Sequence, residues 1–435
     1  MVQGVNFFTF NIFNKKPNLP NIVKIALNNK CITSFYKEAL LIQQAQASTY
    51  GFIKGETPLH YIDNTYKTNI IEHLKNLFFN HCIMNFLCQS ICANKIIIAG
   101  DPVLIDVDLD IEKDGEFFFG VWSINDKIDD KWKKISLKAP GRKNYKDIDK
   151  QVETFIKEEV KNTQNGYNPI AKGDWVSFDM QIVNNNKSPI IEDYKDSLWV
   201  KISKEEGDRE LHELFLGKNI DDVFFTKNLF LQDYISNDSN IKYNISVHIK
   251  DYVPHDNFSL DLFKNHFQLK TTKDMHSKFI EVFSYRNDLS QRRETIEVTL
   301  KLLLKQYYIQ LPAHLLERQK KLVLSAVHNN PDYNVYKSQK DFKDKIRLLA
   351  ERQLKESVII DAISYQENIS VSSKDILSYL NLMHRQRTRE FIYFKIPQTR
   401  FNGQEIPISY EILKLYCLRE KTLNYIINYL TKKNK

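Results

Sequence analysis

Hydrophobic residues recur at every third or fourth position through most of this chain, and at every second position in only a few stretches. Phe7 to Phe13 and Ile22 to Asn28 alternate and predict two strands, joined by a Lys-Lys-Pro-Asn-Leu-Pro turn. Helical spacing follows from Ile32 to Ala47 and resumes from about Tyr61 to Ala93. The first 93 residues therefore predict two strands followed by two long helices.

The spacing changes back to two between Val103 and Ile111, and a second apolar run covers Phe117 to Trp122. Asp114-Gly115 between them is a type I′ turn signal, so we predict a hairpin. Asp106, Asp108 and Asp110 resemble the start of a calcium loop, but the glycine and the twelfth-position glutamate of such a loop are missing. We interpret the three carboxylates as the solvent-facing side of a strand.

The middle of the chain is charged and then rich in strands. Residues 123–165 predict a linker with one helical piece around Ile148 to Val160. Gly173 to Met180 opens a strand-rich stretch, and Lys242 to Tyr252 closes it.

Helical spacing governs the rest of the chain. The predicted helices are a short one from Phe258 to Phe267, long ones at Met275–Tyr308, Ala313–His328 and Gln339–Glu367, and two more at Ser373–Phe394 and Tyr410–Leu430. The chain is thus expected to be α+β and multidomain, with an elongated all-α C-terminal part.

Composition excludes several classes of protein. A length of 435 residues predicts more than one domain, and only 12 glycines and no phosphate-loop motif argue against nucleotide-driven chemistry. No apolar run reaches the roughly 20 residues that a bilayer span needs, so we expect no membrane partner. Five cysteines predict reduced cytosolic thiols. His81, Cys82, Cys88 and Cys92 lie in a helical pattern, so we predict core packing and no metal site.

The net charge of +8 is uneven. Residues 253–435 hold 31 basic against 20 acidic side chains, so the whole surplus is C-terminal. Such a diffuse excess is compatible with weak, salt-sensitive attraction to nucleic acid.

The nine residues Tyr50 to Pro58 separate the two N-terminal helices. Gly51 and Gly55 free the backbone for a tight turn, which would hold Phe52, Ile53 and Lys54 outward. An exposed phenyl ring at a loop tip favours a docking surface. The alternative is a plain connector whose Phe52 folds back onto its own domain.

Gly51-Phe52-Ile53-Lys54-Gly55 with Pro58 resembles the ribosome-docking signature of the trigger factor family. Gly173-Asp174-Trp175-Val176 with Leu216-Gly217-Lys218 resembles the FKBP-type prolyl isomerase domain inserted in that family, and the helix junction at Ile309 to Leu316 resembles its SurA-like C-terminal arm. The resemblance implies a ribosome-binding domain at 1–122, a linker at 123–165, an FKBP-like domain at 166–252 and a helical chaperone domain at 253–435.

The resemblance also implies a cytoplasmic, ATP-independent chaperone without cofactors. It would dock near the exit tunnel of the large ribosomal subunit, on protein and rRNA, and hold nascent unfolded chains for folding and export. Gly51 to Gly55 would be the ribosome-binding residues. Some family members dimerise when free, and the sequence leaves open whether this chain does.

The isomerase motifs depart from the family pattern. Met180 replaces an aromatic residue, and the apolar floor of the cup falls on Asp208, Arg209, Glu210 and Leu211. Charges in an apolar cup are costly unless they are paired. We predict weak or lost isomerase activity, with no confident catalytic residue and a degenerate pocket near Met180, Leu211 and Phe215.

The C-terminal helices carry more apolar residues than one narrow stripe needs. The candidate client-binding residues are Leu304, Tyr307, Tyr308, Phe391, Tyr393 and Phe394, and ordinary helical core is the alternative for each. Two other functions stay open at this stage: an active prolyl isomerase, and an RNA-associated helical adaptor that uses the basic C-terminal half.

Overall fold

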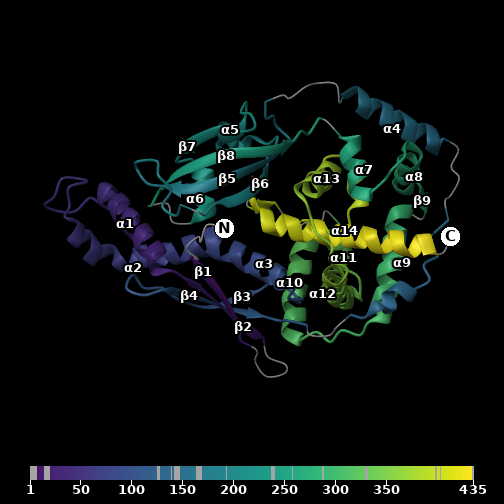
Figure 1. Cartoon of the computed structure of the whole chain (residues 1–435), viewed down its shortest axis with the longest axis horizontal. Helices are drawn as coiled ribbons and strands as arrows, with labels where there is room; N and C mark the ends of the chain where they lie inside the picture. Colours follow the sequence, from purple (N-terminus) through teal and green to yellow (C-terminus); the bar gives the residue numbers. More distant parts are fainter. Residues whose placement is uncertain are drawn as a thin grey trace.

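A computed structural model describes residues 7–13, 20–124, 128–138, 140–141, 147–162, 169–192, 194–236, 241–256, 258–286, 289–328, 332–396, 399–401 and 403–433. Figure 1 shows an elongated molecule in which two sheet-containing units lie toward one end and a group of helices toward the other. The α+β class with a helical C-terminal part is confirmed.

The N-terminal unit is one antiparallel sheet with helices on one face. Its strands are β1 (Phe8–Phe13), β2 (Asn21–Leu27), β3 (Val103–Asp108) and β4 (Gly115–Val121), in the order β1-β2-β4-β3. Its helices are α1 (Asn29–Gln46), α2 (Leu59–Phe78) and α3 (Met84–Ala93), with a π-helical turn η1 (Phe79–Ile83) that joins the last two. Alternate residues of β2 and β4 are buried against these helices, as the period of two predicts. The predicted strands and helices of this unit are confirmed.

The predicted type I′ turn at Asp114-Gly115 is wrong. Six residues separate β3 from β4, and Gly115 is the first residue of β4. A Cβ at Gly115 would lie 2.6 Å from Leu109 Cδ1 and 3.0 Å from Ile32 Cδ1. The glycine is therefore needed for steric room between the sheet and α1, and not for a positive φ.

A second antiparallel sheet follows, in the order β13-β6-β5-β8-β7. Its elements are β5 (Trp175–Val183), β6 (Asp196–Lys201), η3 (Glu206–Asp208), α5 (Arg209–Phe215), β7 (Val223–Thr226), α6 (Leu229–Ile235) and β8 (Asn244–Val253). The edge strand β13 (Ile408–Ser409) comes from the far C-terminal part of the chain and pairs with β6.

The two sheet units share one hydrophobic core. Phe35 of α1 meets Tyr243 edge to face, with ring centroids 6.2 Å apart, and His73 of α2 stacks on the same tyrosine at 5.7 Å. Between the same two units, Asn85 Nδ2 donates to Asp196 Oδ1 at 2.6 Å, and burial raises the pKa of the Asp196 carboxyl. Residues far apart in the sequence thus form a single interior.

The C-terminal part is helical. It comprises α7 (Leu260–Phe267), α8 (Thr272–Phe283), α9 (Gln291–Gln306), α10 (Ala313–His328), α11 (Tyr333–Lys337), α12 (Phe342–Gln366), α13 (Ser373–Met383), η4 (Thr388–Phe391) and α14 (Tyr410–Lys433). Two short pairs, β9 (Tyr285–Arg286) with β10 (Leu289–Ser290) and β11 (Arg400–Phe401) with β12 (Gln404–Glu405), interrupt the helices.

The single helix predicted over Met275–Tyr308 is wrong. The β9–β10 pair divides it into α8 and α9, and Ser290 starts the second helix by accepting a hydrogen bond from Arg293 N–H at 3.2 Å. The prediction over Ser373–Phe394 is too long, because α13 ends at Met383. The breaks at Ile309–Pro312 and before α14 are confirmed.

The segment predicted as a linker contains two helices that contact the helical part. Trp132, in η2 (Asp130–Lys134), is fully buried, and its backbone N–H donates to Tyr307 Oη at 2.9 Å. The predicted helix around 148–160 is confirmed as α4 (Ile148–Asn162), and Phe155 packs edge to face on Phe258. The domain boundaries themselves stay a prediction.

Candidate functional site

The connection between α1 and α2 forms the tip of the N-terminal unit, at one end of the long axis (Figure 1). Gly51 and Gly55 have φ of +86° and +87°, the left-handed region that favours glycine. Phe52 N–H donates to Thr49 O at 3.1 Å, and Glu56 N–H donates to Ile53 O at 3.0 Å. Two tight turns therefore present residues 50–54 to solvent, as the glycine spacing predicts.

The base of this tip is fixed to its helices. Gln44 Nε2 donates to Thr57 O at 2.7 Å, and the Ala47 and Thr57 side chains are buried. The Phe52 ring lies 6.0 Å from the Tyr61 ring of α2, yet Phe52 remains 44% exposed and Ile53 70% exposed. The ring thus leans on its own helix without being covered by it.

Sequence reasoning missed two aromatic members of this tip. Tyr50 is fully exposed beside Gly51, and Tyr61 is 42% exposed at the start of α2. Tyr61 could have been predicted as a member of the tip, because it lies in the first turn of the helix that follows the loop. The tip surface, which we define as Tyr50, Phe52, Ile53, Lys54 and Tyr61, is apolar with one cation.

The residues predicted near a degenerate isomerase pocket lie in a closed core. Met180 and Phe215 are fully buried and Leu211 is 1% exposed. The Phe178 and Phe215 rings are 5.0 Å apart, in contact within the second sheet unit. These side chains come together as predicted, but they fill space instead of lining an open cup.

The charges at the expected floor of that cup have partners. Asp208 is buried, accepts a hydrogen bond from Ser203 Oγ, and accepts another from Glu405 N–H at 3.0 Å. Arg400 Nη2 lies 3.6 Å from the same carboxylate. The carboxylate therefore anchors the β11–β12 pair of the C-terminal part against the start of α5.

The six predicted client-binding residues differ in accessibility. Phe391 is fully buried, and Tyr307 Oη donates to Asp129 O at 2.6 Å. Tyr393 Oη donates to Glu356 Oε2 at 2.7 Å. Leu304 and Phe394 are half-buried, and Tyr308 is 86% exposed. Only Tyr308 among the six is open to solvent.

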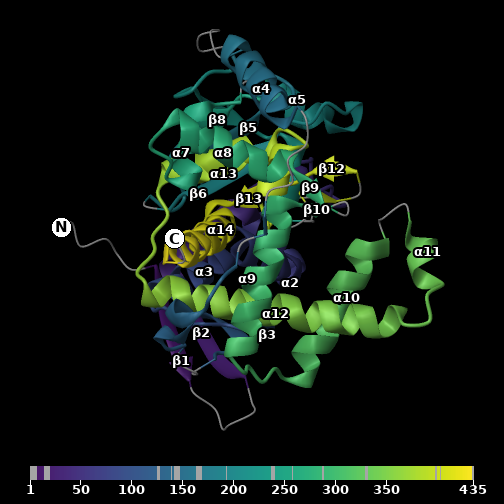
Figure 2. The same ribbon diagram turned by 90° about the vertical axis from the view of Figure 1, so that its right-hand side faces the viewer.

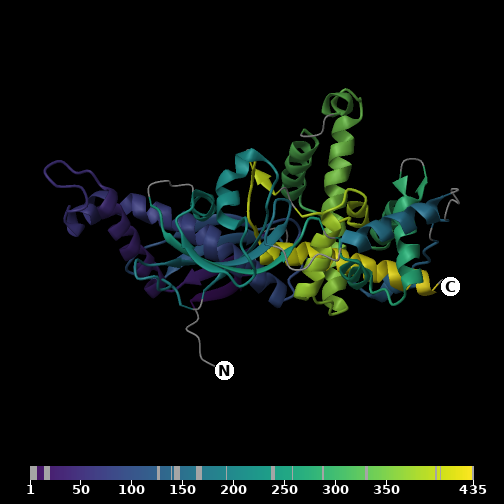
Figure 3. The same ribbon diagram turned by 90° about the horizontal axis from the view of Figure 1, so that it is seen from above.

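The predicted helical arm carries exposed apolar residues that sequence reasoning did not single out. Helices α10, α11 and α12 project from the body of the molecule in Figures 2 and 3. A small core of its own, centred on Val323, Ile346 and Ala350, holds the arm together. The exposed apolar side chains on this arm are Leu322, Val335, Tyr336, Leu348 and Leu349. Helical spacing could not identify them, because apolar residues on a buried face and on an exposed face of a helix recur with the same period.

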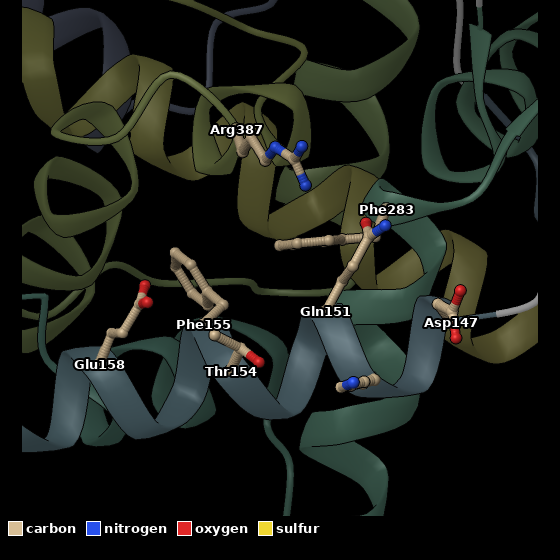
Figure 4. Close-up of a pocket in the computed structure, with 8 residues that line it drawn as sticks. Asp147, Gln151, Thr154, Phe155, Glu158, Phe283 and Arg387 are labelled. Carbon is tan, nitrogen blue, oxygen red and sulfur yellow. The ribbon is translucent and has the colours of Figure 1, made fainter.

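An open pocket of about 460 Å³ lies along α4, as Figure 4 shows. Its apolar groups are the Phe155 and Phe283 rings, and the Arg387 guanidinium lies 4.6 Å from the Phe283 centroid. Asp147, Lys150 and Glu158 border it with charges of both signs. The pocket has no convergent set of donors that would orient a reacting group.

Of the cysteines and the histidine singled out above, His81 and Cys82 lie in the core, and Cys88 and Cys92 are half-buried. Cys82 is fully buried and burial raises its thiol pKa, while His81 Nδ1 lies 3.4 Å from Asp196 Oδ2. Across the described ranges, no three His, Cys, Asp or Glu side chains are grouped as a metal site would require. Within the same ranges, no helix is long and apolar enough to span a bilayer.

Comparison with known proteins is informative for the C-terminal helices. Residues 274–391 match the family model described as the bacterial trigger factor protein C-terminus. No curated protein sequence matches the chain. A solved structure, described in connection with promiscuous substrate recognition by the trigger factor chaperone in folding and assembly, is 14% identical over 97% of this chain and 100% of the other, with a TM-score of 0.35. That likeness is too low to support an argument about the fold. The helices from α8 to η4 are therefore similar in sequence to the C-terminal part of bacterial trigger factor.

Proposed function

We propose that this protein is an ATP-independent chaperone that docks beside the exit tunnel of the large ribosomal subunit and holds emerging polypeptides in an open state. The observation that carries the proposal is the tip surface, a rigid turn that leaves Phe52 and Ile53 exposed at one end of the molecule. Exposed apolar side chains on a fixed turn lose little conformational entropy when a partner covers them. The similarity of the C-terminal helices to trigger factor supports the chaperone role.

In this proposal, apolar contact with ribosomal protein supplies most of the free energy of docking. Lys54 is the single cation of the tip, and it is exposed. Each phosphate neutralised by a lysine contributes about one unit to the slope of log affinity against log salt. Docking should therefore depend on salt with a slope shallower by about one unit than that of a relative with two cations at the tip.

Clients would be held by the helical arm and by Tyr308 at the junction between α9 and α10. These apolar side chains are scattered among charged ones, and such a surface binds many extended segments weakly. Of the other predicted client residues, Leu304 is half-buried, and Phe391 is fully buried in the cluster of phenylalanines around Phe263. The protein would act in the cytoplasm, without cofactor or membrane partner.

Pelleting with ribosomes tests the docking proposal. Replacing Phe52, Ile53 and Lys54 together by alanine should weaken co-sedimentation at least tenfold, because the apolar contact and the cation are lost at once. Val335, Tyr336 and Lys337 on α11 provide a matched control, with an aliphatic, an aromatic and a lysine side chain exposed in a row. Their triple alanine variant should pellet like the wild type.

Two outcomes would contradict the proposal. Unchanged pelleting of the tip variant would remove the tip from the interface. Loss of pelleting only after charge reversals among the C-terminal lysines would favour an RNA-associated adaptor, the alternative that the basic C-terminal half supports.

We also infer that prolyl isomerisation is weak or lost. The side chains that should form the cup are buried in a core shared with the N-terminal unit, so an X-Pro segment has no access to them. The full-length chain should not accelerate a proline-limited refolding reaction, whereas an intact FKBP-type domain added at equal concentration should. Acceleration close to that of the control would instead support the active isomerase.

A further inference from the structure

Strand β3 is an edge strand with apolar side chains open to solvent. Among the described residues it pairs only with β4, with a shift of register between Leu104 and Asp106, so its other side faces outward. Val103 is 46% exposed, Leu104 37% and Ile105 53%. Three consecutive exposed aliphatic residues on a sheet edge are a feature that soluble proteins ordinarily avoid.

The solvent face of the sheet next to this edge is also apolar. Gly120 of β4 has no side chain, and a Cβ there would lie 3.3 Å from Ile105 Cδ1 and 3.8 Å from Pro20 Cβ. Ile105 therefore lies across β4 toward Pro20. Ile22 and Phe118 on the same face are half-buried. An added strand at β3 would extend this apolar face.

The second half of the same edge is acidic. Asp106 and Asp108 follow the aliphatic residues, and Asp110 and Glu112 continue beyond the strand. The one cation paired with them is Lys113, 2.6 Å from Asp108 Oδ2, and both partners of that pair are about half exposed. Asp106 Oδ1 accepts a hydrogen bond from Val107 N–H at 2.9 Å. The edge thus has an apolar half and an anionic half in a fixed order.

We propose that the β3 edge binds an extended segment of an unfolded polypeptide as an additional antiparallel strand, and that the segment carries basic residues followed by apolar ones. Main-chain hydrogen bonds along a sheet edge recognise any extended chain, and the side chains then select its sequence. An antiparallel partner places its N-terminal half opposite Asp106 and Asp108, and its C-terminal half opposite Val103 and Leu104. This order of charges follows from the direction of β3. The inference rests on the proposed function insofar as unfolded chains are the clients.

A second copy of this chain fits the edge less well. Two β3 strands paired with each other would place Asp106 and Asp108 of each copy against the aliphatic half of the other, and would remove carboxylates from water without a cation. A basic client segment removes that penalty. The charge of the edge therefore favours a client over self-association.

Fluorescence anisotropy with labelled peptides tests this inference on the full-length protein. One dodecapeptide would have three lysines followed by alternating valine and threonine, and a second would have the same residues in reverse order. We expect the first to bind at least tenfold more tightly than the second. N-methylation of alternate backbone amides on the hydrogen-bonding edge of the first should remove binding, because an added strand needs those donors.

Variants locate the peptide on the structure. Ile105→Lys should weaken binding of the first peptide at least tenfold, and Asp106→Asn with Asp108→Asn should weaken it severalfold and reduce its salt dependence. Leu41→Lys on α1 is the matched control, an exposed aliphatic residue outside the tip surface and the helical arm replaced by the same cation, and should leave binding unchanged.

Four results would overturn the inference. Equal affinity for both peptide orders would remove the directional recognition, and full affinity of the N-methylated peptide would remove strand addition. Loss of binding in Val335→Lys on α11 but not in Ile105→Lys would place the peptide on the helical arm, which leaves the chaperone proposal intact.

Ribosome pelleting of Ile105→Lys should equal that of the wild type, so failure of this inference is distinguishable from failure of the docking proposal. Sedimentation of a wild-type dimer that Ile105→Lys dissociates would assign the edge to a second copy instead.

Discussion

Replacing Glu420 by alanine should destabilise the helical part by about 3 to 5 kcal/mol, the cost typical of removing one partner from a buried charged pair. Glu420 is fully buried in α14, and its Oε2 accepts hydrogen bonds from Tyr393 N–H at 2.9 Å and Phe394 N–H at 3.0 Å. Its Oε1 lies 3.6 Å from Nη2 of Arg292, which is 1% exposed. Alanine would leave two backbone donors and a guanidinium without this acceptor.

Burial raises the pKa of Glu420, and Arg292 opposes that rise. Glu420→Gln keeps a carbonyl acceptor for the two backbone N–H groups and the same shape. We therefore expect the glutamine variant to lose much less stability than the alanine variant. Urea unfolding followed by far-UV circular dichroism measures both.

Glu317 in α10 is the control for this comparison. It pairs with Lys320 at 2.9 Å, but its side chain is 62% exposed. Glu317→Ala should change the free energy of unfolding by about 0.5 kcal/mol or less. A glutamine variant of Glu420 as unstable as the alanine variant would contradict the acceptor role and point to the charge alone.

Lowering the pH should destabilise the helical part through two buried imidazoles. Burial lowers the pKa of His384 to about 3, with His255, Lys201, Arg385 and Arg389 adding to the effect. Neither ring nitrogen of His384 has a hydrogen-bond partner among the described residues, so the neutral ring occupies a site between cations.

His266 behaves in the same way on α7. Its pKa is lowered to about 3, mainly by burial and also by the charges of Arg292, Lys278 and Lys421. Asp375 acts in the opposite direction. Its Nε2 lies 3.1 Å from Asn424 Nδ2, an arrangement that requires the unprotonated nitrogen as acceptor.

The sign of the pH dependence follows from these depressed values. The unfolded chain binds a proton at each histidine below about pH 6.5, whereas the folded chain does so only near pH 3, so stability is complete above pH 6.5 and falls as the pH drops. At pH 5 each histidine should cost about 2 kcal/mol relative to pH 8. Chemical unfolding at pH 8, 6 and 5 measures this loss.

Variants separate the imidazoles from the carboxyl groups that titrate in the same range. His384→Leu should reduce the loss between pH 8 and pH 5 by about 2 kcal/mol, because leucine has no proton to bind. His60→Leu, which replaces an exposed ring on α2, is the control variant. An identical slope in wild type and His384→Leu would show that His384 is protonated in the folded state.

Periodicity predicted most elements of this fold because apolar spacing depends on local geometry. The strands of the first sheet and the helices on both sides of the tip follow it closely. The break at residues 284–290 was missed because the apolar positions on both sides keep helical spacing while the chain reverses between them. The turn at Gly115 was misread because the glycine is required by Leu109 and Ile32, residues that local turn rules do not consider.

A site could be predicted from the sequence to the extent that residues near it in the chain determine its conformation. Two glycines and a proline fix the tip turn, so its exposed side chains could be predicted from spacing. Client residues depend on which stripe of each helix a distant helix covers, as at Phe391, whose ring meets Phe263 at 5.2 Å. The sequence predicted β3, with its aliphatic and acidic halves, as a strand. Its place at the edge of the sheet was not predicted, because that place depends on which strand it pairs with.

The shared interior of the two sheet units also sets the order in which this chain can fold during its own synthesis. His73 and Tyr243, which stack in that interior, are 170 positions apart in the sequence. At about 5 to 20 residues per second, translation separates them by roughly 8 to 34 s. During that interval the helices that carry Phe35 and His73 have left the ribosome while the surface that covers them has not been made. The nascent protein therefore exposes, for seconds, the kind of apolar surface that chaperones bind.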